Sequence, residues 1–248
     1  TGNPFYADQI EKSLYNALMA ALKDDASQIA KYSPMEGHRC EGEEQCGMHI
    51  NCCNANGPRA FALIPDFAVK KMGNEVYVNY YGDMSASLEN GHNKVLVKQH
   101  TTYPVSNVID ITIDVTKENV FGLHLRVPVW SAQTVITLNG EELKDICPGT
   151  YHAITRKWKK GDHIQIILDM PARLLEQNQM QAIVRGPIVL ARDSRFNDGF
   201  VDETLVVDSE DGIVKAEVDS VPGFAWMRLK VPVTVGTDLE GVGMYRNI

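Results

Sequence analysis

The stretch Ile109-Asp110-Ile111-Thr112-Ile113-Asp114-Val115 alternates strictly between β-branched apolar and polar residues. Successive side chains of a β-strand point to opposite faces of a sheet, so this stretch predicts a strand with one buried face and one wet face. Residues 123–129 repeat the alternation, and Pro128 near their end predicts a sheet edge or a bulge. Further strand-like segments flank them at short intervals, at residues 75–81, 94–98, 134–138, 151–155 and 164–168. Short strands at this spacing are typical of an antiparallel β-sandwich.

Turn signals separate these segments. Asn139-Gly140, directly after residues 134–138, is typical of a type I′ hairpin, and Lys160-Gly161-Asp162 predicts a second turn. A second group of strands is predicted after Arg173, at residues 180–184, 187–191, 204–207 and 227–233. We therefore expect a β-sandwich over residues 71–172 and a second sandwich-like domain over residues 173–248.

The first part of the chain has a helical period instead. Asn3 and Pro4 are typical of a helix N-cap and first helical position. Apolar residues then recur at three- and four-residue steps, while Glu11, Lys12 and Lys23 occupy the opposite face; the apolar positions are Ile10, Leu14, Leu18, Ala21 and Leu22. Such a stripe needs a partner, which we expect upstream of Thr1 in a longer protein.

A second, shorter helix is predicted to start at Gly57-Pro58, with Pro65 inside it. Its expected buried positions are Ala60, Phe61, Ile64 and Phe67. The period changes from helical to two after Lys71. The sequence therefore predicts a mainly β protein whose helix is confined to the first 70 or so residues.

Composition narrows the classes of function. The chain has 248 residues, 44% of them hydrophobic and 23% charged, as in ordinary globular proteins. Its net charge of −8, with no lysine- or arginine-rich stripe, argues against a nucleic-acid partner. No apolar run reaches the length of a membrane span.

Four of the five cysteines, Cys40, Cys46, Cys52 and Cys53, lie within fourteen residues of one another. Such clustering favours a local site over a distributed disulfide framework. Adjacent cysteines seldom bond to each other, but they can face one metal, or one can ligate while its neighbour attacks a substrate. A structural four-cysteine zinc site and a pair of disulfides are the alternatives that spacing leaves open. His49 and Arg59 flank the pair as candidate substrate-binding residues.

Seven segments together carry a resemblance to a known family: Tyr6–Ala17, Cys52–Arg59, Ala62–Ala68, Leu125–Trp130, Leu138–Gly140, Trp158–Asp162 and Arg185–Pro187. The double-cysteine segment is the most specific of these. Through them the chain resembles glycoside hydrolase family 127, the β-L-arabinofuranosidase-type enzymes. The resemblance implies an (α/α)6 barrel followed by β-sandwiches, with residues 1–70 forming the end of the helical catalytic domain.

The same resemblance implies that Cys52 is the nucleophile and a zinc ligand, and that Cys53 is a zinc ligand. The family's other ligands come from an upstream Glu-x-Cys segment and its acid/base is a further upstream glutamate, none of which is in this chain. We therefore expect zinc to be weakly held or absent here, and the acid/base is unknown. Glu36, Glu41, Glu43 and Glu44 belong to a charged loop that is typical of a solvated surface.

Two classes of function remain. The first is part of a retaining glycoside hydrolase that acts on arabinose-containing glycans and packs against an N-terminal barrel. The alternative is a non-catalytic carbohydrate-binding or structural β-sandwich module with a four-cysteine zinc site. Nothing in the sequence indicates a nucleic-acid or membrane partner.

Overall fold

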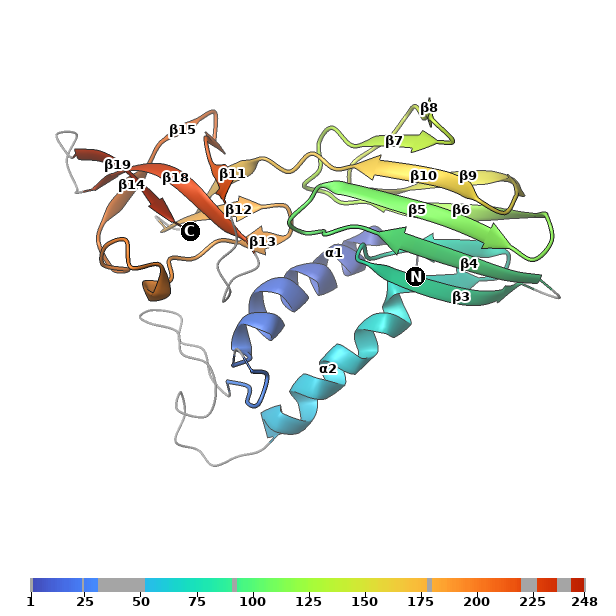
Figure 1. The fold of residues 1–248 in the computed structure, drawn as a ribbon, viewed down its shortest axis with the longest axis horizontal. Helices are drawn as coiled ribbons and strands as arrows, with labels where there is room; N and C mark the ends of the chain where they lie inside the picture. The colour runs from blue at the N-terminus through green and yellow to red at the C-terminus, as the bar shows by residue number, and fades with distance from the viewer. Residues whose placement is uncertain are drawn as a thin grey trace. The chain divides into compact units, whose positions relative to one another are not determined.

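The computed structural model describes residues 2–23, 25–30, 52–90, 93–177, 180–219, 227–235 and 242–247. Its chain divides into two compact units, Thr1–Asp169 and Met170–Ile248. The fold is mainly β with antiparallel sheets, as predicted, and the long helices lie before residue 70 (Figure 1). Within the described residues, no helix is long and apolar enough to cross a membrane.

The first unit contains two sheets. One has the order β1 (Val69–Met72), β2 (Glu75–Val78), β6 (Asn119–Val127) and β9 (Thr150–Trp158). The other has the order β3 (Met84–Asn90), β4 (Asn93–His100), β5 (Val108–Val115), β10 (Asp162–Ile167), β7 (Val135–Leu138) and β8 (Glu141–Glu142). Among the described strands, β2 and β6 form the one parallel pair, and all the others pair antiparallel.

The predicted alternation sets the core of this sandwich. In β5, Ile109, Ile111 and Ile113 are fully buried while the residues between them are half-exposed. Trp158 is also fully buried and donates its indole N–H to the Phe121 carbonyl. Trp130, in contrast, lies in a turn and is half-buried. At the predicted hairpin, Asn139 and Gly140 both have positive φ, as a type I′ turn requires, and they join β7 to β8.

The second unit also contains two sheets. One has the order β13 (Ile188–Val189), β12 (Met180–Arg185), β11 (Ala172–Gln177), β16 (Ile213–Val214) and β15 (Ser209–Glu210). In the other, β18 (Arg228–Val235) pairs with β14 (Leu205–Val207), β17 (Glu217–Asp219) and β19 (Val242–Asn247). Residues of both sheets form its core, including Ile183, Val231 and Val233. Each segment predicted as a strand in either unit overlaps an observed one.

The first helix begins where the sequence predicts. Helix α1 spans Pro4–Ser13, Asn3 is its N-cap, and the Asn3 side chain accepts from the Phe5 N–H. The chain then continues as a π-helical turn, Leu14–Leu18, and a 3-10 turn, Met19–Ala21. Just beyond, Leu22 and Ile29 form an isolated antiparallel bridge, so the chain folds back toward the helix end.

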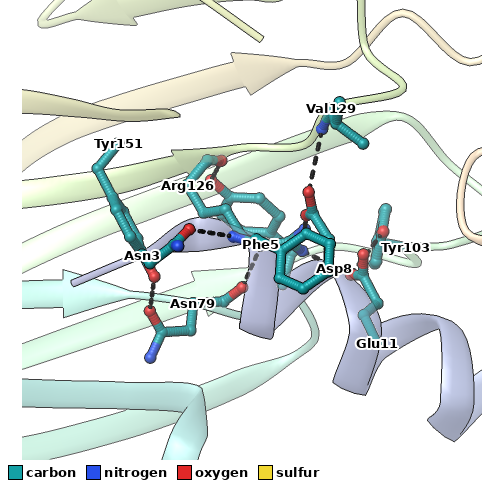
Figure 2. Close-up of polar contacts among 10 residues, drawn as sticks. Asn3, Phe5, Asp8, Glu11, Asn79, Tyr103, Arg126, Val129 and Tyr151 are labelled. Carbon is teal, nitrogen blue, oxygen red and sulfur yellow. Dashed lines mark hydrogen bonds and ion pairs between the residues drawn. The ribbon is translucent and has the colours of Figure 1, made fainter. Parts of the chain in front are cut away.

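Charged residues attach α1 to the sandwich, and here the sequence prediction is wrong. Glu11, predicted on the solvated face, is 2% exposed, and Asp8 is 9% exposed. Both face Arg126 of β6, which is completely buried (Figure 2). The guanidinium donates from Nη1 to Asp8 Oδ1 at 2.5 Å and from Nη2 to Glu11 Oε1 at 2.7 Å. The helix therefore docks by its acidic face rather than by the predicted apolar stripe.

The remaining polar atoms around Arg126 are also mostly satisfied. Its Nε donates to the Asn79 carbonyl at 2.5 Å, Tyr103 donates to Glu11 Oε1 at 2.8 Å, and the Val129 N–H donates to Asp8 Oδ2 at 3.3 Å. Burial alone would lower the pKa of the Arg126 guanidinium, but the adjacent Glu11, Tyr103 and Asp8 raise it above its ordinary value. The guanidinium therefore stays charged at any pH at which the protein is folded.

Replacing Arg126 by Met should lower the free energy of unfolding by about 3–5 kcal/mol, because two buried carboxylates lose their counter-ion. Urea unfolding curves of the wild type and the variant measure the loss. Adding Asp8→Asn and Glu11→Gln to that variant should recover part of it, since the buried charges are then gone.

Lys98→Met is the matched control, because the Lys98–Asp114 ion pair is solvent-exposed on the same sandwich. The loss of unfolding free energy in Lys98→Met should be much smaller than the loss in Arg126→Met. A similar loss for Arg126→Met and Lys98→Met would contradict the assignment of α1 docking to the buried ion pairs.

Candidate functional site

The two adjacent cysteines begin the second helix of the first unit. Helix α2 spans Cys52–Ala68 and runs without a break through Pro58 and Pro65. The prediction that this helix starts at Gly57-Pro58 is therefore wrong. A proline at the first helical position is common, but both prolines here lie inside the helix, seven residues apart and exposed on one face.

The helix gives the two thiols different surroundings. Cys52 is exposed and Cys53 is half-buried, and no disulfide joins them. Residues spaced by four and seven along a helix share a face, so Cys52 lies on the same face as Asn56 and Arg59, both exposed. Cys53 shares its face with Gly57, which is buried. The neighbours in sequence thus belong to two different sides of α2.

The sulfur atoms are nevertheless close together. Cys52 Sγ and Cys53 Sγ lie 3.9 Å apart. Two thiolates on one tetrahedral zinc, each about 2.3 Å from the metal, are about 3.8 Å apart. The pair therefore fits as two of four zinc ligands. Among the described residues, no group of three or more His, Cys, Asp or Glu side chains is arranged to hold a metal.

Of the other predicted site residues, the structure describes some and not others. Arg59 is exposed and donates from Nη1 to Asn56 Oδ1 at 3.2 Å, which holds its side chain along the Cys52 face. His49 lies outside the described residues, as do Cys40 and Cys46 and the acidic run from Glu36 to Glu44. The fifth cysteine, Cys147, is exposed on the first sandwich.

Gly57 sets the distance between α2 and the chain segment that follows the first helix. A Cβ atom built on Gly57 would lie 2.4 Å from Cδ1 of Ile29, and Ile29 is 8% exposed. Only glycine leaves room for this buried side chain without a shift of the neighbour. The contact is one helical turn from Cys53, so it fixes the start of α2 against the bridge at Ile29. Sequence reasoning treated Gly57 as a helix start and missed this role.

Eleven residues of α1, of its π-helical and 3-10 continuation and of α2 line a mostly apolar groove of about 530 Å³. The side chains include Ile10, Leu14 and Leu18 of the predicted apolar stripe, and Leu63, Ile64 and Phe67 of α2. Leu63 and Phe67 remain 44% and 39% exposed. Part of the expected stripe thus borders an open groove between the two helices.

Comparison with known proteins shows which family model and which solved structures this chain is similar to. Residues 75–170, which include β2 through β10, match the family model of the GH127 middle domain of β-L-arabinofuranosidases. A comparison with curated proteins finds no match.

Solved structures share the fold of the whole chain. A GH127 β-L-arabinofuranosidase from Geobacillus stearothermophilus T6 is 20% identical with a TM-score of 0.78, covering 99% of this chain and 43% of that one. A GH127 β-arabinofuranosidase is 23% identical with a TM-score of 0.80, covering 100% of this chain and 42% of that one. A protein described as a glycoside hydrolase is 24% identical with a TM-score of 0.79, covering 99% of this chain and 44% of that one. The chain therefore spans less than half the length of the structures it matches.

Replacing Gly57 by Ala should destabilise the protein, although alanine is the better helix former by about 1 kcal/mol. The added methyl group meets Cδ1 of Ile29 inside a packed contact, and overpacking of this kind costs about 1–3 kcal/mol. Urea unfolding of the purified variant gives the change.

Ile29→Val removes the clashing Cδ1 atom and provides the control background. In the Ile29→Val background, Gly57→Ala should become neutral or stabilising. The wild type, the two single variants and the double variant form a double-mutant cycle, which should show a clear coupling energy between the two positions. Strict additivity of the two substitutions would show that Ile29 does not set the requirement for glycine.

Proposed function

We propose that the chain is the C-terminal portion of a glycoside hydrolase, on the premise that residues 75–170 match the family model of the GH127 middle domain. The match of these residues to the family model is the observation that carries the proposal. The common fold over 99–100% of the chain supports it, because that fold includes α1, α2 and both sandwich units. The reaction proposed is retaining hydrolysis of β-linked L-arabinofuranosides in arabinose-containing glycans.

Cys52 is the proposed nucleophile. Its thiol is exposed at the beginning of α2, on the face that also carries Arg59. The backbone N–H groups of a first helical turn have no intrahelical partners and favour negative charge nearby. Arg59, held by Asn56, is proposed to donate hydrogen bonds to substrate hydroxyl groups.

Cys53 is the proposed zinc ligand, with Cys52 Sγ near enough to contact the same ion. The half-buried position of Cys53 and the 3.9 Å separation of the sulfur atoms support this division of roles. When bound, zinc would hold the thiols as thiolates at neutral pH. The remaining ligands and the acid/base are assigned to the N-terminal part of the parent protein.

The proposed reaction has two steps. The Cys52 sulfur attacks the anomeric carbon while the bond to the leaving oxygen breaks, and the general acid protonates that oxygen. Water, deprotonated by the same group acting as base, then attacks the anomeric carbon and releases the Cys52 sulfur. Two displacements at one carbon give net retention of configuration.

Serine substitutions in the full-length parent separate the two cysteines. Cys52→Ser should lower hydrolysis of an aryl β-L-arabinofuranoside by at least about 10³-fold, since the nucleophile is lost. Most of the zinc should remain, because the other ligands are intact. Cys53→Ser should lose both activity and zinc. Hydrolysis rates and zinc content by elemental analysis are the measurements.

Cys147→Ser is the control, since this exposed cysteine lies outside the proposed site. It should change neither rate nor zinc content. Full activity in Cys52→Ser would refute the nucleophile assignment, and unchanged zinc in Cys53→Ser would refute the ligand assignment.

The zinc content of the 248-residue chain distinguishes the proposal from a structural four-cysteine site. With only two of the proposed ligands, Cys52 and Cys53, the chain should lose zinc on gel filtration against a weak chelator. Stoichiometric zinc that survives this treatment, together with its loss in Cys40→Ser, would favour the four-cysteine site instead.

A further inference from the structure

One face of the sheet β1-β2-β6-β9 points away from the sandwich core. Register pairing places Lys70, Tyr77, His124 and Ala153 in one row across its four strands. The residues on the opposite face of the same strands, such as Val76 and Leu123, are completely buried. The outward row is polar and aromatic, so it has a composition that core packing does not explain.

The beginning of α1 crosses this face and forms a hollow with it. Side chains and backbone of α1, α2, β1, β2 and β9 enclose about 470 Å³, a size typical of small-molecule sites. Five aromatic rings line the hollow: Tyr6, Phe67, Tyr77, Tyr80 and Tyr151. Tyr6 is 54% exposed although it lies beside the buried acidic face of α1.

Two rings of the hollow, Tyr77 and Tyr151, are held in place by ring contacts and a hydrogen bond. Tyr77 stacks on His124 with ring centroids 4.2 Å apart and planes 10° from parallel. Tyr151 meets Tyr77 edge to face at 5.2 Å, and its hydroxyl donates to Asn79 Oδ1 at 2.5 Å (Figure 2). Asn79 Nδ2 in turn donates to the Phe67 carbonyl. A ligand that enters would lose little affinity to ordering these side chains.

A polar pair lies beside the stacked rings. His124 Nε2 and Glu75 Oε2 are 2.7 Å apart, and the Glu75 side chain is 40% exposed. The carboxylate occupies the space beside Gly122 in which a Cβ atom would lie, since that atom would be only 1.7 Å from Glu75 Oε2. Glycine at this strand position therefore allows Glu75 to reach His124, and the histidine ring that supports Tyr77 is thereby fixed.

We propose that this hollow binds a neutral saccharide. A sugar ring has apolar C–H faces and a rim of hydroxyl groups, and tyrosine provides a flat apolar surface with a hydroxyl at its edge. Among the described residues that line the hollow, Lys70 is the one charged side chain, and the other polar side chains, those of the four tyrosines, Asn3 and Asn79, are neutral. Asn3 and Lys70 provide polar groups at the border of the hollow. The choice of arabinose-containing sugars as ligands rests on the proposed function.

Ligand-observed NMR on the 248-residue chain tests this proposal. The probes are L-arabinose and an L-arabinofuranosyl disaccharide, added in the presence of a chelator so that metal does not contribute. Saturation transfer to the sugar C–H protons is expected. Tyr6→Ala should weaken binding by about tenfold or more, because the most exposed ring of the hollow is lost. Tyr77→Ala should abolish detectable binding.

Phe200→Ala is the matched control, since this ring is 79% exposed in the other unit and does not line the hollow. It should leave binding unchanged. Urea unfolding of Tyr6→Ala checks that the variant is as stable as the wild type.

Three outcomes would overturn the proposal: no saturation transfer to either sugar, equal binding by wild type and Tyr6→Ala, or protein atoms of the full-length parent filling the hollow in a crystal structure. The test is independent of the reaction. If Tyr6→Ala loses sugar binding while Cys52→Ser of the parent keeps full activity, the proposed function alone is refuted. If Tyr6→Ala binds sugar as the wild type does while Cys52→Ser of the parent is inactive, the saccharide site alone is refuted.

Discussion

A buried guanidinium decides how the helices of this protein meet the sandwich. Arg126 faces two carboxylates of α1 in a site from which water is excluded, and the cost of desolvating three charges is large. Such a cluster is therefore tolerated only in the geometry where every charge has its partner. An apolar contact would allow α1 to slide or rotate, whereas Asp8 and Glu11 at helical spacing match the guanidinium in one orientation. The tyrosines around the cluster remain neutral, because burial raises the pKa of Tyr80 to about 12 and those of Tyr81 and Tyr103 above their ordinary value.

The position of α1 determines the position of the cysteines through a short series of contacts. The helix continues as π- and 3-10 turns, and the chain then returns so that Leu22 and Ile29 pair. Ile29 packs against Gly57, one turn after Cys53. At the other end of α2, Ala68 packs with Ala7 of α1 and with Tyr80, and the chain passes directly into β1. Both ends of α2 are thus tied to structure that Arg126 fixes, although much of the helix surface between them is exposed.

Period and turn chemistry predicted most of the fold, because both are local. The alternation at residues 109–115 and the Asn139-Gly140 hairpin report on neighbours in sequence and are confirmed by the structure. The docking of α1 is not local: Glu11 and Arg126 are separated by 115 positions, and an isolated glutamate on a helix is normally solvated. The start of α2 was missed because Gly57-Pro58 has the composition of a helix beginning. Gly57 instead packs closely against Ile29, a contact that no local pattern reveals.

The adjacency of Cys52 and Cys53 has a physical consequence that a wider spacing would not have. Two thiols three or four residues apart on a helix lie on one face and have the same surroundings. Successive helix residues instead diverge by about 100°, so one thiol can face the packed side of α2 while the other faces the open side. Their sulfur atoms still lie 3.9 Å apart, within reach of a common ion. The proposed site, with one permanent ligand and one sulfur that bonds to carbon, would be well served by such neighbours. The burial of Gly57 on the Cys53 side and the exposure of Arg59 on the Cys52 side extend that difference along the next turn of the helix.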